Sequence, residues 1–260
     1  MTPWHLTLAT DGRHPLFDDE DAVRRAVRVL VRAAPDDLAL FCFVDDHAHF
    51  VALVDSPRIG KLARALVLGL RPHASAHVEP ARVRPVESRA HMESLVKYVL
   101  TQPTRHGVAA DPARWTGSCF QDLVGARAIG LKLKLAKALP RLRLRDVQSI
   151  VGLGSDPISG LQDDAIRAAG IGRLVAAATV ACSVDSALAG NTAPVVAARR
   201  AISQLARDVG IPASEVAFAL RITERAARRL LEPPVSEPST AAIRTRLGLE
   251  FALDARREAR

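Results

Sequence analysis

Two apolar runs separated by three polar residues constrain the fold of this chain most strongly. Residues 38–44 and 48–54 each have the length and apolar character of a buried strand, and only Asp45, Asp46 and His47 lie between them. Parallel strands need a crossover of a dozen or more residues, so a connection this short joins antiparallel neighbours. The two runs therefore predict a β-hairpin.

The segments around this hairpin alternate between strand and helix patterns. Residues 4–10 and 82–86 are short β-type runs, whereas helical spacing is found at residues 18–34, 57–70 and 88–102. We expect Pro103 to stop the last of these helices. The resulting order, β-α-β-β-α-β-α, predicts an α+β fold of the ferredoxin-like kind, with helices packed on an antiparallel sheet.

The character of the chain changes after residue 146. The remainder is rich in Ala, Leu and Arg, has almost no aromatic residues, and is predicted to be entirely helical. Its turn signals are the glycine-containing segments 152–160, 170–172, 190–191 and 210–212. We expect Glu232, Pro233 and Pro234 to end this helical part, and residues 236–260 to form a charged tail helix.

The charge distribution indicates a polyanionic partner. The 260 residues include 36 Lys and Arg against 28 Asp and Glu, a net charge of +8. One run between residues 123 and 145 holds seven basic residues and no acid, and a second cluster between residues 199 and 229 holds seven arginines. Either run alone could be a solvated helix face, but two in one chain favour nucleic acid.

Cysteine usage and hydropathy point to a cytoplasmic protein. Cys42, Cys119 and Cys182 are odd in number, far apart and without a Cys-x-x-Cys pair, which disfavours a disulfide framework or a zinc ribbon. The start of the sequence has no signal-peptide pattern, and no apolar run is long enough to cross a bilayer. We therefore expect no membrane partner.

Two local patterns carry candidate chemistry. His47 and His49 are two apart on a predicted strand, so both imidazoles project from one face and could hold one metal ion; the alternative is a pair of half-buried polar residues at a hairpin end. Tyr98, the one tyrosine of the chain, stacks four residues before Gln102 on a helix face. Its alternative interpretation is an ordinary aromatic residue at the edge of the core.

Four blocks of the sequence, in order, resemble the REP-associated tyrosine transposases, single-tyrosine relatives of the HUH transposases that act on single-stranded DNA. Residues 98–108 are similar to their Tyr-Ile-x-x-Asn-Pro-Val-Arg-Ala-Gly signature, and residues 111–118 to the acidic-Pro and Trp-Ser-Ser stretch that follows it. Residues 44–49 resemble their Met-Pro-Asn-His-Val-His motif, and residues 4–8 with 15–17 their opening strand and loop. The resemblance covers roughly residues 4–125.

This resemblance implies a ligand set and a nucleophile. His47, His49 and Gln102 would bind Mg²⁺ or Mn²⁺, and Tyr98 would attack a phosphate of single-stranded or hairpin DNA to give a 5′-phosphotyrosine and a free 3′-hydroxyl. Related enzymes include monomers and homodimers. The chain departs from the family pattern at Asp45 and Asp46, which replace Pro-Asn, at Gln102, which replaces Asn, and at His106, which replaces alanine.

Residues 197–224 resemble the C-terminal helix-turn-helix domain of the replication initiator DnaA. Ser214 would cap the first helix of this motif and Thr223 the recognition helix. The alternative is a helical bundle with a charged surface. We expect this second domain to bind duplex DNA. The candidate DNA-binding residues of the whole chain are Arg105, Lys132, Lys134, Arg199, Arg200, Arg221, Thr223, Arg225, Arg228 and Arg229.

The expected organisation is a nuclease domain (1–125), a basic linker (126–145), a helix-turn-helix domain (146–235) and a tail helix (236–260). The predicted function is metal-dependent cleavage and rejoining of DNA at hairpin-bearing repeats. Two alternatives remain open: a domesticated protein that binds such repeats without cutting them, and a hydrolytic metalloenzyme that uses the His-x-His pair. Water-mediated hydrolysis would survive loss of Tyr98, whereas transesterification would not.

Overall fold

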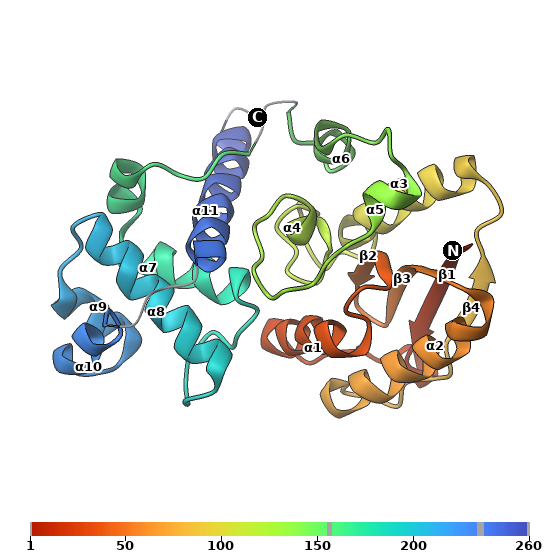
Figure 1. Ribbon diagram of the computed structural model, residues 1–260, viewed down its shortest axis with the longest axis horizontal. Helices are drawn as coiled ribbons and strands as arrows, with labels where there is room; N and C mark the ends of the chain where they lie inside the picture. The colour runs from red at the N-terminus through yellow and green to blue at the C-terminus, as the bar shows by residue number, and fades with distance from the viewer. Residues whose placement is uncertain (1, 155–157, 233–236, 259–260) are drawn as a thin grey trace. The chain divides into compact units, whose positions relative to one another are not determined.

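The chain is an α+β protein with two compact units (Figure 1). The computed structural model describes residues 2–154, 158–232 and 237–258. The first unit comprises Met1–Leu123 and Gly130–Pro157, and the second comprises Val124–Ile129 and Ile158–Arg260. Residues 126–145, expected to link two domains, are thus divided between the units.

A four-stranded antiparallel sheet organises the first unit. Its strands are β1 (Thr2–Ala9), β2 (Leu38–Phe43), β3 (His47–Val54) and β4 (Arg82–Pro85). They lie in the order β2-β3-β1-β4, so β1 and β3 are central and β4 is an edge strand. The predicted hairpin is confirmed as β2 and β3, which pair antiparallel and consist entirely of buried residues.

The helices of the first unit cover the sheet. The longer ones are α1 (Glu20–Ala33), α2 (Ser56–Leu70) and α3 (Arg89–Arg105); the short ones are η1 (Asp11–Arg13), η2 (Arg71–His73), α4 (Phe120–Leu123), α5 (Leu135–Ala138) and α6 (Leu144–Ile150). Helices α1 and α2 pack against each other, and α3 contacts β2 (Figure 1). Alternation along β1 buries Leu6 and Leu8 completely while His5 and Thr7 point to the opposite face.

Helix α3 runs further than the sequence predicted. Pro103 lies inside the helix and does not stop it. A proline removes only its own backbone N–H, and the next turn still forms because the backbone N–H of His106 donates to the carbonyl of Gln102 at 3.0 Å. The start agrees with the prediction, since Ser88 caps the helix by accepting from the backbone N–H of His91 at 3.1 Å. The extra turn carries Arg105 and leads to His106.

The described part of the second unit is helical, as the sequence predicted. Its helices are α7 (Asp163–Ala181), α8 (Ala193–Asp208), α9 (Ala213–Leu220), α10 (Glu224–Arg229) and α11 (Glu237–Glu258). Gly170, with φ 77° and ψ 172°, interrupts α7 at the predicted turn, and Gly210, with φ 78°, lies between α8 and α9. Pro233 and Pro234, expected to end this helical part, lie outside the described residues.

Helix α11 contributes to the core of the second unit. Its side chains Ile243, Leu247 and Leu249 are fully buried, and it packs on α7 and α8. The predicted helix is therefore present at this end of the chain, but an apolar face packs it into the core, and its charged residues between 244 and 256 are half-buried or buried. Among the described residues, no helix is both long and apolar enough to span a membrane.

Candidate functional site

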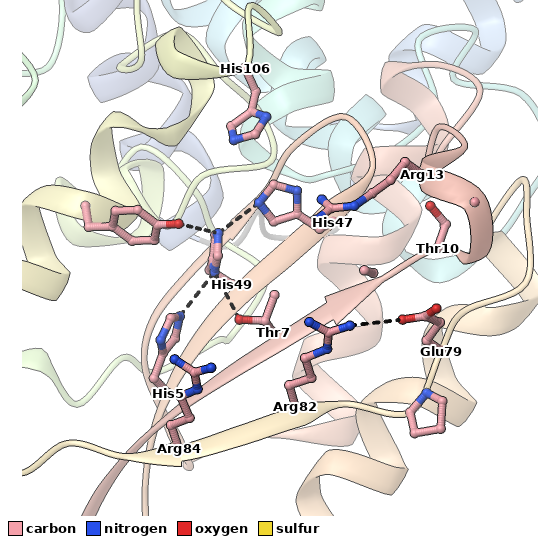
Figure 2. Close-up of a pocket in the computed structure, with 14 residues that line it drawn as sticks. His5, Thr7, Thr10, Arg13, His47, His49, Glu79, Arg82, Arg84 and His106 are labelled. Atoms are coloured by element: carbon pink, nitrogen blue, oxygen red, sulfur yellow. Dashed lines mark hydrogen bonds and ion pairs between the residues drawn. The ribbon is translucent and has the colours of Figure 1, made fainter.

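A cavity of about 520 Å³ opens on the face of the sheet that carries the two histidines of β3 (Figure 2). The side chains that matter for its chemistry come from β1, β3, β4, α3 and the loops beside them: His5, Thr7, Arg13, His47, His49, Arg82, Arg84, Tyr98 and His106. Residues predicted from the sequence to carry chemistry and residues that were not predicted meet here.

Strand alternation and register bring these residues together. His47 and His49 point to one face of β3, as predicted from their spacing of two. Thr7 of β1 pairs with His49, and on its other side Thr7 pairs with Arg82 of β4. His5 pairs with Arg84 in the same way. Three adjacent strands therefore present polar side chains to the same cavity.

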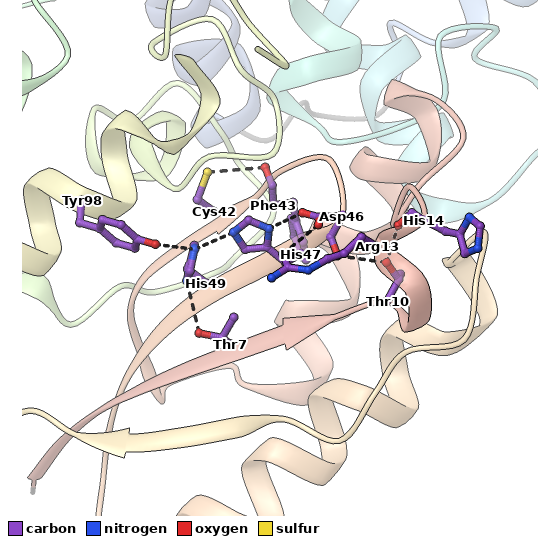
Figure 3. A network of polar contacts seen from close by, with 10 residues as sticks. All are labelled: Thr7, Thr10, Arg13, His14, Cys42, Phe43, Asp46, His47, His49 and Tyr98. Carbon is purple, nitrogen blue, oxygen red and sulfur yellow. Dashed lines mark hydrogen bonds and ion pairs between the residues drawn. The ribbon is translucent and has the colours of Figure 1, made fainter. Parts of the chain in front are cut away.

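The two imidazoles of β3 converge on one point. Nε2 of His47 lies 2.9 Å from Nε2 of His49, and the side chains are buried, 6% and 3% exposed (Figure 3). Nδ1 of His47 contacts Oδ1 of Asp46 at 2.5 Å, and Nδ1 of His49 lies 3.1 Å from Nε2 of His5. With a proton on each Nδ1, both Nε2 lone pairs face the shared space, which is how histidines are oriented to bind a metal ion.

The electrostatic environment keeps His49 neutral. Burial, together with repulsion from His47, His5 and His106, lowers the pKa of His49 to about 3. Burial raises the pKa of Asp46, but hydrogen bonds with His47 and Arg13 outweigh it, so that this pKa falls below its ordinary value. At neutral pH the His49 imidazole is therefore neutral and the Asp46 carboxylate is ionised.

Tyr98 lies beside the histidine pair. Its Oη is 3.4 Å from Nε2 of His49, and the two ring centroids are 5.0 Å apart (Figure 3). The guanidinium carbon of Arg105 lies 5.5 Å from the centroid of the Tyr98 ring. A phenol hydroxyl and two imidazole nitrogens thus lie side by side in one cavity, an arrangement in which a hydroxyl could act as a nucleophile next to a bound metal ion.

Gln102 lies close to this group but is turned differently from the histidines. It is 1% exposed, its Nε2 donates to the backbone carbonyl of Tyr98 at 3.2 Å, and it is not among the residues that line the cavity. Its Oε1 is buried and has no hydrogen-bond partner within the described residues. This unpaired oxygen, on the helix that also carries Tyr98, leaves a donor atom available to a divalent metal ion.

Sequence reasoning missed several residues that line the cavity or lie next to it. His106 and Asp46 were visible only as departures from the family signature, yet ligand atoms of Asp46, His47 and His106 all lie within 4.8 Å of one another. Arg82 and Arg84 were assigned to a strand without a role, although their spacing of two on an edge strand places both on the cavity face. His5 had no signal beyond its place in a predicted strand.

The candidate DNA-binding residues, all within the described part of the chain, are not among those that line this cavity. Within the first unit, Lys132 is exposed and Lys134 is half-buried at the start of α5. Within the second, Arg199 and Arg200 are half-buried on α8, and an Nη1 of Arg199 donates to the carbonyl of Gly190 at 3.2 Å. The residues predicted on or beside α10 are all exposed: Arg221, Thr223, Arg225, Arg228 and Arg229.

The two predicted helix caps have different outcomes. Thr223 is the N-cap of α10, and its hydroxyl accepts from the backbone N–H of Ala226 at 3.2 Å. Ser214 does not cap α9, because the N-cap of that helix is Pro212 and Ser214 lies in its first turn. Proline fixes the extended entry into a helix without a capping side chain, so the start of α9 shifts by two residues from the prediction.

No protein-family model matches the chain, and no curated protein sequence is similar to it. Among solved structures, the chain is similar to a REP-associated tyrosine transposase bound to a REP hairpin, with 16% identity and a TM-score of 0.40. That similarity covers 52% of this chain and 87% of the other.

Proposed function

We propose that this protein is a metal-dependent transesterase of single-stranded DNA, which cleaves and rejoins strands at hairpin-bearing repeats as the REP-associated tyrosine transposases do. The observation that carries the proposal is the position of Tyr98 Oη, 3.4 Å from Nε2 of His49, which in turn is 2.9 Å from Nε2 of His47. The signature blocks at residues 44–49 and 98–108 support the same assignment.

His47, His49 and Gln102 would hold the ion, Mg²⁺ or Mn²⁺ in this proposal. When bound, a divalent ion polarises the scissile phosphate and stabilises the charge that develops on it. Tyr98 Oη attacks the phosphorus, a new P–O bond forms, and the bond to the 3′ oxygen breaks. The phenol loses one proton and the leaving 3′ oxygen gains one, so protons balance over the step.

The product of this attack is a 5′-phosphotyrosine and a free 3′-hydroxyl. Because a phosphodiester replaces a phosphodiester, the reverse reaction on another 3′-hydroxyl rejoins a strand without ATP. A free tyrosine has a pKa near 10 and is a weak nucleophile at neutral pH, so it needs a positioned, polarised phosphate. The half-buried position of Tyr98 at the cavity wall supports this role.

The fold and charge of the first unit support DNA as the substrate. A sheet in the order β2-β3-β1-β4 with helices between β1 and β2 and between β3 and β4 is consistent with a ferredoxin-like nuclease domain. Arg13, Arg82 and Arg84 line the cavity, and Arg105 lies over the ring of Tyr98. Guanidinium groups so placed could bind the phosphates on either side of the scissile one.

The second unit would hold the protein on its target. In this proposal α8, α9 and α10 form a helix-turn-helix of the DnaA type, and α10 places Arg225, Arg228 and Arg229 against duplex DNA. Exposure of these three side chains and the Thr223 cap support it. In this proposal residues 1–125 are the nuclease domain and residues 146–235 the helix-turn-helix domain. Residues 126–145 are the basic linker between them, and residues 236–260 are the tail helix.

A denaturing-gel assay tests the proposal. Wild type, Tyr98→Phe and the control Ser94→Ala, a change at an exposed position of the same helix, are incubated with Mn²⁺ and labelled oligonucleotides from repeats flanking the native gene. We expect a shifted covalent band with wild type and Ser94→Ala only. A band that persists in Tyr98→Phe would refute the nucleophile, and binding without any band would favour the domesticated repeat-binding protein.

A further inference from the structure

We infer that His106 supplies a third imidazole to the ion that His47 and His49 hold, an inference that rests on the proposed function. His106 is the residue that ends α3, one turn past Pro103, and it lines the same cavity as the two histidines of β3. Figure 2 shows its ring directed toward His47, and the two ring centroids are 4.6 Å apart.

The His106 side chain is available for this role. It is exposed, and within the described residues its imidazole makes no hydrogen bond, so binding an ion would break none. A ligating nitrogen of His106 falls within 4.8 Å of those of His47 and of the Asp46 carboxylate. Two nitrogens bound to one ion at the Zn²⁺–imidazole bond length of about 2.0–2.1 Å lie at most about 4.2 Å apart, so the exposed His106 side chain would close on the ion by rotation of its ring.

Two neighbouring groups are less suited than His106 to this third position. The Asp46 carboxylate contacts Nδ1 of His47 at 2.5 Å and an Nη1 of Arg13 at 2.9 Å, so it orients the histidine instead. Gln102, the third ligand that the proposed function takes from the family resemblance, directs its amide nitrogen to the carbonyl of Tyr98 and lies outside the cavity lining, so the third position goes to His106 instead. A His47–His49–His106 set presents three nitrogens, which suit Zn²⁺ or Co²⁺ better than Mg²⁺.

Direct binding of Co²⁺ to the full chain, followed by its visible absorption, tests this inference without any DNA. The variants are His106→Ala, His106→Asp, Gln102→Ala and the double change His47→Ala with His49→Ala. His77→Ala is the matched control, because His77 is an exposed histidine that does not line the cavity. Thermal unfolding in chelator checks that each variant is folded.

We expect His106→Ala to weaken Co²⁺ affinity by roughly tenfold or more and to change the absorption band, while His77→Ala leaves both unchanged. His106→Asp, which retains a ligating atom, should recover part of the affinity. Wild-type affinity and spectrum in His106→Ala would overturn the inference. If His106→Ala bound Co²⁺ normally and Gln102→Ala bound it more weakly, the inference would fail but the proposed function would stand. If wild type bound no Co²⁺, the inference and the metal role of His47 and His49 would both fail.

Discussion

The hydroxyl of Tyr98 lies 3.4 Å from Nε2 of His49, although 49 positions separate the two residues in the sequence. The contact joins α3 to β3 across the cavity face of the sheet. It places the one tyrosine of the chain within hydrogen-bond distance of a nitrogen that is kept neutral at pH 7. The proposed nucleophile and the proposed metal ligands therefore share one cavity.

Loss of both histidines of β3 should abolish stabilisation by metal. At an Mn²⁺ concentration 100 times its Kd, an ion bound only to the folded state adds about 2.7 kcal/mol to the free energy of unfolding. We expect Mn²⁺ to raise the Tm of wild type and of His77→Ala, but not that of His47→Ala with His49→Ala. Differential scanning fluorimetry measures this, and an equal Tm rise in the double variant would contradict the metal site.

Arg84→Ala should weaken binding of single-stranded DNA and make it less sensitive to salt. Arg84 is exposed on edge strand β4 and lines the cavity, so it can neutralise one phosphate. Removing one such contact from a single strand should reduce the slope of log K against log salt by about 0.7. Fluorescence-anisotropy titrations measure the slope. Arg32→Ala, at an exposed arginine on α1, should leave it unchanged, and the same slope in both variants would exclude a phosphate contact by Arg84.

In metal-free protein, His49 should make stability fall as the pH is lowered. Its pKa in the folded state is about 3, against 6.5 when unperturbed, so between these values the unfolded chain binds a proton that the folded chain does not. The free energy of unfolding is therefore lost as pH falls below 6.5, by up to about 1.4 kcal/mol per pH unit from this group. Urea unfolding in chelator should show a flatter dependence for His49→Gln than for wild type; equal dependences would show that His49 does not titrate this way.

Thr223→Ala should destabilise the second unit more than Ser214→Ala. The hydroxyl of Thr223 accepts a hydrogen bond from the first turn of α10, and losing such a cap costs about 1 kcal/mol. Ser214 caps nothing and is exposed, so its replacement should change the free energy of unfolding by less than about 0.5 kcal/mol. Chemical unfolding followed by circular dichroism compares the two. Equal losses would contradict the assignment of the caps.

The sequence predicted the strands and the main helices of the first unit because their signals are local. Residues 38–54 contain an apolar run, a short polar connection and a second apolar run, which is enough to specify a hairpin. The spacing of His47 and His49 likewise fixed their common face, because strand periodicity is two. The predicted end of α3 at Pro103 was wrong, because a proline near the end of a helix removes a single backbone N–H and one more turn can still form.

The rest of the cavity depends on tertiary contacts that no local pattern encodes. His5 and Arg84 reach the cavity through the pairing of β1 with β4, and the strand order cannot be read from either segment alone. His106 reaches it only because α3 continues past Pro103. Ser214 shows the same limit on a smaller scale, since a residue type that favours capping does not by itself locate the start of α9, which follows Pro212.

The central claim is that Tyr98 becomes covalently joined to DNA, and mass spectrometry of the adduct tests it most directly. Wild-type protein, incubated with Mn²⁺ and a single-stranded oligonucleotide of the flanking repeat, is digested with nuclease and protease, and the peptide bearing residual nucleotide is sequenced. The account predicts a nucleotide joined through its 5′ phosphate to Tyr98. Cleaved DNA with a nucleotide on another residue, or with no nucleotide on the protein, would contradict it.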